Sequence, residues 1–306
     1  MTFSPLPTGP VSSADVVGLA RRSEGSLWVA LANSSIYVAA PGSQALRLLP
    51  NLPTSVSGST VVVDVAATAT EVFILRVGGA LRCQGACTSF TDFTPAGTVG
   101  GIETAVGLCA RDQRAFFLSQ QNATTALWEL QAGTFVQTVA DLGVGRAQNC
   151  YLSPAGELMV PGDTVAVISS TGGLTNEAFN LNGHPGASWR AVTTADAGSF
   201  AVGGGSGYRF AKRAGNVWSD LTPNTAGALM ATIVTAGNDV YAGGYTNTGL
   251  TSTPAIYKWN GSAFAALSPQ PYAIDVTAAL EVSANELYFG GSARTGGGYE
   301  VLHGTR

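Results

Sequence analysis

Hydrophobic and polar residues follow one another in short runs along this chain, and the clearest set lies between residues 229 and 269. Four runs rich in β-branched, aromatic and small apolar residues, at 230–235, 240–243, 255–259 and 264–267, predict β-strands. Gly237-Asn238-Asp239 and Asn260-Gly261-Ser262 lie between them and predict tight turns, because Gly and Asn tolerate positive φ. This stretch is interpreted as one four-stranded antiparallel unit.

Variants of this unit recur along the chain. The outer strand is marked by an aromatic or apolar residue, two spacers and then Leu or a substitute, as in Phe264-Ala265-Ala266-Leu267. The marker positions are Leu6, Leu49, Phe93, Thr138, Leu181, Leu221 and Leu267, at intervals of 40 to 46 residues. The distance from Leu267 through the C-terminus to Leu6 fits the same spacing, which predicts a closed ring.

The predicted fold is therefore all-β, a seven-bladed β-propeller with four-stranded antiparallel blades. A single domain would span residues 1–306, with blades at about 11–50, 55–95, 100–139, 145–181, 187–223, 228–269 and 273–306. The last blade has three predicted strands of its own. Residues 2–7 are expected to supply its fourth strand, which closes the ring and removes two open sheet edges.

Glycine pairs end the second strand in three repeats, as Val202-Gly203-Gly204, Ala242-Gly243-Gly244 and Phe289-Gly290-Gly291. A tyrosine then opens the third strand, at Tyr208, Tyr257 and Tyr299. This pattern resembles kelch-type repeats, whereas residues 25–30 resemble bacterial regulator-type propeller repeats. The resemblance implies a propeller and leaves the chemistry open, because such folds carry many functions.

Composition narrows the class of partner. The net charge is -4, the pI is near 5.1 and the basic residues are scattered, so no nucleic-acid partner is expected. No run of 18 apolar residues occurs, so no transmembrane segment is expected. Residues 1–5 lack the basic region and the apolar region of a secretory signal peptide. Either the protein stays inside the cell, or a signal peptide that preceded residue 1 was removed.

Four cysteines favour the second alternative. Cys83 and Cys87 could close a short loop, and Cys109 and Cys150 occupy equivalent first strands of consecutive repeats. Two disulfides and an extracytoplasmic location are the interpretation, with buried free thiols at Cys109 and Cys150 as the alternative. A zinc site needs about four ligands. Cys83 and Cys87 supply two, and the chain contains only two histidines, His184 and His303, so no zinc site is expected.

No nucleophile motif of the G-x-S-x-G type occurs, so no catalytic residue is assigned. Counting back from the second strands places Asp15, Asp275 and Arg146 in a ring at the mouth of the central funnel. Asp15 and Asp275 would be neighbours after closure. They could hold Ca²⁺ with carbonyls and waters, or they could be solvated carboxylates, and no resident cofactor is predicted.

The expected ligand-binding surface is the rim where second strands lead into third strands and one blade leads into the next. Its candidate residues are Tyr245, Tyr272, Trp189, Arg190, Asn122 and His184. Trp28, Trp128, Trp218 and Trp259 recur at strand positions and are predicted to pack between blades, and Trp189 could do either.

The function that this sequence favours is a non-catalytic, extracytoplasmic, monomeric binding module that recognises a glycan or a protein through one propeller face. One alternative is an enzyme (lyase, glycosidase or oxidoreductase) with its site in the central funnel. The other is a structural module of a larger surface protein.

Overall fold

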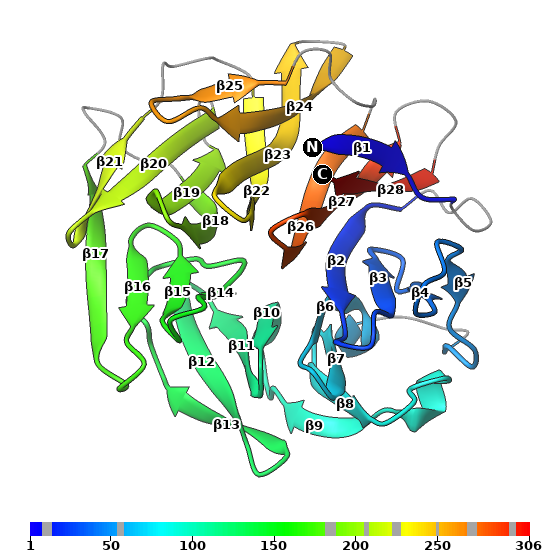
Figure 1. Ribbon diagram of the computed structural model, residues 1–306. Coiled ribbons are helices and arrows are strands. Elements are labelled where there is room, and N and C mark those ends of the chain that lie inside the picture. Colours follow the sequence, from blue (N-terminus) through cyan, green and yellow to red (C-terminus); the bar gives the residue numbers. More distant parts are fainter. Residues whose placement is uncertain are drawn as a thin grey trace.

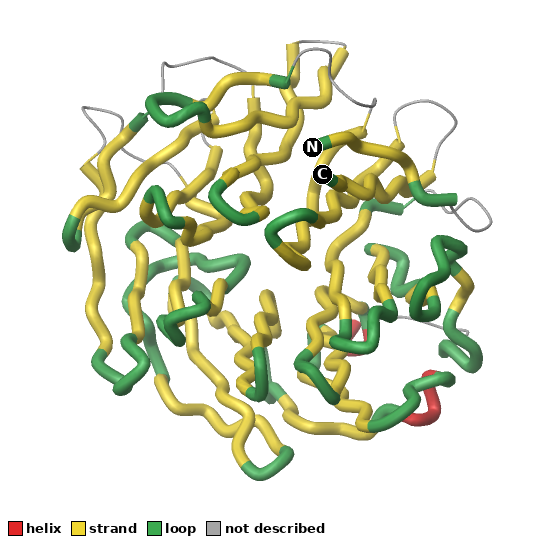
Figure 2. The backbone as a smooth tube through the Cα atoms, in the orientation of Figure 1, coloured by secondary structure: helices red, strands yellow, loops and turns green. Residues whose placement is uncertain are grey.

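The computed structural model describes residues 1–7, 14–53, 58–180, 188–204, 208–221, 228–248, 251–267, 274–293 and 298–306. These residues form seven four-stranded blades around a central axis (Figure 1), and nearly all the regular structure is strand (Figure 2). Two 3₁₀ turns, η1 (Gly58–Thr60) and η2 (Phe90–Asp92), are also present. No helix in the described ranges is long and apolar enough to span a bilayer.

In the first half of the ring, each blade runs from an inner to an outer strand. Blade 1 contains β2 (Val16–Arg21), β3 (Leu27–Leu31), β4 (Ile36–Ala39) and β5 (Arg47–Leu48). Blade 2 contains β6 (Val62–Ala67), β7 (Glu71–Arg76), β8 (Gly79–Gln84) and β9 (Thr94–Thr98). Blade 3 contains β10 (Thr104–Arg111), β11 (Arg114–Gln121), β12 (Thr124–Gln131) and β13 (Thr134–Val139).

The remaining blades keep this order. Blade 4 contains β14 (Tyr151–Leu152), β15 (Leu158–Pro161), β16 (Val165–Ile168) and β17 (Leu174–Asn180). Blade 5 contains β18 (Ser188–Ala195), β19 (Gly198–Gly204), β20 (Tyr208–Ala214) and β21 (Val217–Asp220). Blade 6 contains β22 (Ala228–Ala236), β23 (Asp239–Thr248), β24 (Thr251–Trp259) and β25 (Phe264–Ala266). Blade 7 contains β26 (Ile274–Ser283), β27 (Glu286–Ala293), β28 (Gly298–Thr305) and β1 (Thr2–Pro5).

The N-terminal strand closes the ring, as predicted. β1 pairs antiparallel with β28, with Phe3 opposite Gly304, and the two termini lie side by side in Figure 1. The Leu6 amide donates to the Val301 carbonyl at 2.8 Å. The Phe3 ring lies 5.9 Å from that of Phe289. Closure therefore rests on main-chain pairing and on an apolar contact.

Buried apolar clusters fill the space between neighbouring blades, one for each of the seven interfaces. Trp28, Trp218 and Trp259 are at most 8% exposed, and Trp128 is partly buried and stacks on Phe117. Their predicted role in packing between blades is confirmed. Because a fully buried aromatic side chain contributes a few kcal/mol, these clusters account for much of the cohesion of the ring.

The glycine pairs let the next blade approach closely. A Cβ on Gly243 would lie 2.4 Å from Cγ1 of Val276, and one on Gly290 would lie 2.7 Å from Cγ1 of Val16. Both valines belong to the inner strand of the following blade. A side chain at either glycine would push two blades apart.

Blades 4 and 5 depart from the expected pattern of separate sheets. Their outer strands β17 and β21 pair in parallel, with Phe179 opposite Trp218, which makes one eight-stranded sheet. The Phe179 ring also stacks on Trp189, with 4.0 Å between ring centroids. These contacts place both outer edges together, where they satisfy each other's backbone groups.

Blade 4 differs at its inner strand as well. The sequence predicts a strand over 147–152, but β14 contains only Tyr151 and Leu152. The Ala147 amide donates to the Thr125 hydroxyl, and the Cys150 amide donates to the side chain of Asn149. These side-chain acceptors replace the ladder bonds of a regular strand.

Candidate functional site

A large groove lies between blades 1 and 2 on one face of the ring. We name it the blade 1–2 groove. Its volume is about 1000 Å³. It is lined by Arg22, Ser23, Glu24, Ser26, Trp28, Val38, Ala40, Pro41, Ser43, Ala45, Arg47, Leu48, Leu49, Pro50, Ala69, Thr70, Gly85, Ala86, Cys87 and Thr88. This volume is in the range of protein ligand sites, which are concave and mostly apolar.

The blade 1 side of the groove follows from a short outer strand. β5 has two residues, and none of the described residues pairs with its far edge. Trp28, Val38 and Arg47 lie opposite one another across β3, β4 and β5, so their side chains share the face toward blade 2. Leu48, next to Arg47, is 49% exposed. The groove therefore has an apolar inner part and a cationic outer end.

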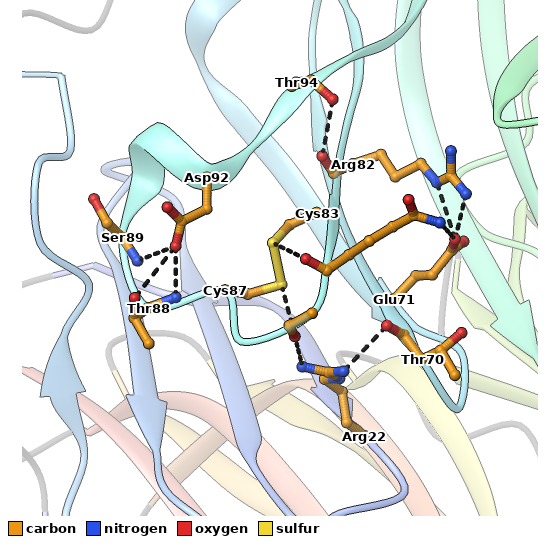
Figure 3. Close-up of a disulfide and its surroundings, with 12 residues drawn as sticks. Arg22, Thr70, Glu71, Arg82, Cys83, Cys87, Thr88, Ser89, Asp92 and Thr94 are labelled. Carbon is orange, nitrogen blue, oxygen red and sulfur yellow. Dashed lines mark hydrogen bonds and ion pairs between the residues drawn. A yellow bond between two sulfur atoms is a disulfide. The ribbon is translucent and has the colours of Figure 1, made fainter.

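The blade 2 side is a short loop held by a disulfide, shown in Figure 3. Cys83 and Cys87 are bonded, with 5.9 Å between their Cα atoms. After the loop, Ser89 and Asp92 form a capping box at the start of η2. The amides of Thr88 and Ser89 donate to Asp92 at 2.8 and 3.0 Å. These bonds fix the wall in place before any ligand arrives, which lowers the ordering cost of binding.

Arg22 joins the two walls (Figure 3). Its guanidinium donates to the Gly85 carbonyl at 2.6 Å and to the Thr70 carbonyl at 3.1 Å. Its Nε lies 3.3 Å from a Glu24 oxygen. Ser23 also donates to the Ala69 carbonyl at 2.8 Å. These contacts tie the first hairpin of blade 1 to blade 2, so the width of the groove is set within the fold.

The groove opens on the face opposite to the predicted rim. It is built from the connections between first and second strands, such as 22–26, and between third and fourth strands, such as 40–46. The rim proposed from the sequence uses the connections at the other ends of the same strands. Sequence reasoning missed the groove because its walls come from different blades, although the short Cys83–Cys87 loop was a visible signal.

A second cavity, of about 310 Å³, lies on the axis and is lined by the inner strands of all seven blades. We name it the axial chamber. Asp64 lies in this chamber and is half-buried. One of its oxygens accepts from the Val65 amide at 2.8 Å and the other from the Leu108 amide at 3.1 Å. A Cβ on Gly18 would lie 2.3 Å from this carboxylate, so Asp64 occupies the space where blade 1 has no side chain.

Burial raises the pKa of Asp64 to about 7, and the two main-chain amides lower it only in part. A carboxyl with that pKa could act as a general base. Both of its oxygens, however, are already bonded to the backbone of blades 2 and 3. This arrangement favours a role in joining inner strands.

Removing the charge of Asp64 is expected to change how stability depends on pH. Because the native carboxyl has a pKa near 7 and an unfolded one has a pKa near 4, the native state binds more protons between those values. The contribution of Asp64 is therefore fully present below about pH 4 and is lost as the pH rises to 7, by about 1.4 kcal/mol per unit. Urea unfolding of wild type and of Asp64→Asn at pH 4.5, 6 and 8 measures the difference. Parallel curves for the two proteins would contradict this prediction.

The far end of the axial chamber is crossed by an ion pair. Arg111, at the end of β10, lies 3.1 Å from Glu281 of β26. The Arg111 guanidinium also lies 5.9 Å from the ring centre of Tyr151. Burial, and next the charge of Glu281, raises the pKa of Tyr151. Side chains from blades 3, 4 and 7 therefore meet at this end of the axis.

The predicted funnel residues lie outside the lining of the axial chamber. Asp15 is exposed before β2, Asp275 is half-buried in β26 and Arg146 is exposed before β14. The prediction that blade 7 lies beside blade 1 is confirmed, because the Thr277 hydroxyl donates to the Val16 carbonyl at 2.6 Å. No cluster of metal-ligating side chains is found in the ranges that the structure describes. Asp64 of β6 and Glu281 of β26 are the acids that line the axial chamber.

The predicted rim residues are scattered. Tyr272 and His184 lie outside the described residues. Trp189 is fully buried against Phe179, which corrects the expectation of an exposed ring and supports the packing alternative. Asn122 is exposed in the turn between β11 and β12, Tyr245 is half-buried in β23, and Arg190 is half-buried at a bulge of β18. Their role in binding stays a prediction.

Both predicted disulfides are present. Cys109 and Cys150 are bonded and join the inner strands of blades 3 and 4, and Cys83 and Cys87 form the groove wall. None of the four cysteines is free, so the alternative of buried free thiols at Cys109 and Cys150 is wrong. Disulfides of this kind are typical of oxidising compartments.

Comparison with known proteins gives the fold. No protein-family model matches the chain, and no curated protein sequence matches it. The structure of U3-55K is similar over 100% of this chain and 98% of its own, with 13% identity and a TM-score of 0.71. Streptogramin B lyase is similar over 98% and 96%, with 13% identity and a TM-score of 0.70. YCF48 bound to a D1 peptide is similar over 100% and 97%, with 12% identity and a TM-score of 0.68.

These similarities are to WD40-type and other β-propellers, and identities of 13% or less support the fold alone. Neither U3-55K nor the other two structures is named as a kelch protein, so the kelch-type resemblance of the sequence stays a prediction. The propeller fold itself often serves protein interaction, as in the structure named as the mitotic checkpoint complex.

Proposed function

We propose that this chain is a non-catalytic, extracytoplasmic binding module that takes an extended segment of a partner protein in the blade 1–2 groove. The groove carries the proposal. Its volume is about 1000 Å³, its inner part is apolar, and its walls are held by a disulfide and by Arg22. Such a rigid, preformed cleft suits a peptide segment better than a flat protein surface.

Two further observations support the proposal. The two disulfides favour an exported protein. YCF48, which shares the fold, is known with a bound D1 peptide, so a propeller of this size can hold a peptide. The non-catalytic part rests on Asp64, because both oxygens of this carboxylate in the axial chamber accept main-chain bonds.

Filling the groove tests the proposal. Ala45 is exposed and lines the groove, so Ala45→Trp blocks it without touching the core. Ile102 is 74% exposed in the connection between β9 and β10 and does not line the groove, so Ile102→Trp is the matched control. The probe is a library of random linear dodecapeptides displayed on phage and selected on wild-type protein. We expect a peptide selected on wild type to bind Ile102→Trp equally and Ala45→Trp at least tenfold more weakly, which corresponds to about 1.4 kcal/mol.

Two results would contradict the proposal. One is a selected peptide that binds Ala45→Trp as tightly as wild type. The other is binding to a glycan array with no peptide enriched in the library, which would favour the glycan alternative. Thermal unfolding of both variants shows whether they are folded.

A further inference from the structure

The charges of the blade 1–2 groove are unevenly balanced. Three charged residues line it, Arg22, Glu24 and Arg47. The Arg22 guanidinium forms an ion pair with Glu24 and donates hydrogen bonds to two carbonyls of blade 2. Arg47 is exposed and has no ion-pair partner among the described residues. The groove thus carries one uncompensated cation on a chain whose net charge is -4.

The position of Arg47 relates this charge to the apolar part of the groove. Trp28, Val38 and Arg47 form one row across β3, β4 and β5, with Trp28 at the inner end. Because neighbouring strands lie about 4.8 Å apart, the backbone of Arg47 is about 10 Å from that of Trp28. An extended peptide covers this distance in about three residues.

We infer, on the basis of the proposed function, that the segment bound in the blade 1–2 groove carries an apolar side chain and a carboxylate within about three residues of each other. The apolar side chain packs over the exposed part of Val38 and over the neighbouring apolar residues that line the groove, with the buried Trp28 beneath them. The carboxylate, from Asp, Glu or a free C-terminus, binds the Arg47 guanidinium, which suits a planar carboxylate with two parallel hydrogen bonds.

The open edge of β5 adds a weaker contribution. A peptide could pair with its backbone, but β5 offers only two residues. Few main-chain bonds are therefore available, and side-chain chemistry has to provide the selectivity. Arg47 and the apolar row are the groups in place to provide it.

Charge reversal tests this inference. The dodecapeptide library is selected separately on wild type, on Arg47→Glu and on Arg146→Glu. Arg146 is exposed between blades 3 and 4 and does not line the groove, so its reversal is the matched control. We expect wild type and Arg146→Glu to enrich Asp or Glu within three positions of an aliphatic or aromatic residue. Arg47→Glu should enrich Lys or Arg at that place, and it should bind a wild-type-selected peptide at least tenfold more weakly.

The outcomes separate the two proposals. If wild-type-selected peptides lack an acid and bind Arg47→Glu as tightly as wild type, but are blocked by Ala45→Trp, the groove binds peptides and the inferred carboxylate is wrong. If Ala45→Trp binds them as tightly as wild type, the groove is not the site and the proposed function fails. Weaker binding to wild type at 0.5 M than at 0.05 M salt would support the charge contact.

Discussion

Replacing Glu177 by alanine is expected to lower the free energy of unfolding by about 3 to 5 kcal/mol. Glu177 is 2% exposed and holds three donors at the junction of blades 4 and 5. It accepts from Arg213 Nε at 2.8 Å, from Trp218 Nε1 at 2.9 Å and from a second Arg213 nitrogen. The variant leaves the buried Trp218 N–H without its acceptor and leaves the half-buried Arg213 guanidinium with only Glu157, 3.5 Å away. The unsatisfied donors dominate the expected loss.

A matched control is available on blade 3. Glu129 pairs with Arg114 at 3.1 Å, but its side chain is 29% exposed, so water can replace it. Glu129→Ala should cost about 1 kcal/mol or less. Guanidinium chloride unfolding of both variants at neutral pH measures the contrast. Equal losses would mean that the parallel pairing of β17 with β21, and not the carboxylate, holds the two blades together.

Replacing Cys109 and Cys150 by alanine is expected to have the second largest effect. The bond closes a loop between residues separated by 41 positions, and the chain-entropy relation assigns such a loop about 4 kcal/mol. Cys83 and Cys87 are separated by 4 positions, and the same relation gives about 2 kcal/mol. We therefore expect the Cys109 and Cys150 double variant to unfold at lower denaturant than the Cys83 and Cys87 double variant.

The smaller disulfide has a second expected effect. Because its loop forms one wall of the groove, its loss should weaken peptide binding, whereas the loss of the Cys109–Cys150 bond should not. Peptide binding is measured at low temperature, where both double variants are folded, and stability is measured by denaturant unfolding. If the two double variants lose equal stability, residual structure in the unfolded chain outweighs loop length.

The ring, its closure and its disulfides could be predicted from the sequence. Turn residues and strand patterns are local signals, and their regular spacing is enough to place Leu6 on the last blade. The glycine pairs were expected to end the second strands, but β23 continues to Thr248 and β27 to Ala293. Gly243 and Gly290 lie inside these strands, where a side chain would meet the next blade.

The candidate sites could not be predicted in the same way. The blade 1–2 groove exists because β5 is short and a loop of another blade stands opposite it, which no single repeat encodes. Asp64 interrupts an apolar strand, but its neighbours Gly18 and Leu108 come from two other blades. Trp189 is an inner-strand residue whose partner Phe179 reaches it through the joined sheet of blades 4 and 5. These features depend on three-dimensional neighbours.

The pairing of Thr2 with Thr305 determines the order in which this molecule is assembled. During synthesis the first strand emerges from the ribosome without a partner, and it has to wait until β28 has been made. Six blades can form meanwhile, with the exposed edge of an unfinished seventh beside them. The slowest step of folding is therefore expected to be the return of the N-terminal segment to the seam, because it brings together the two most distant parts of the sequence.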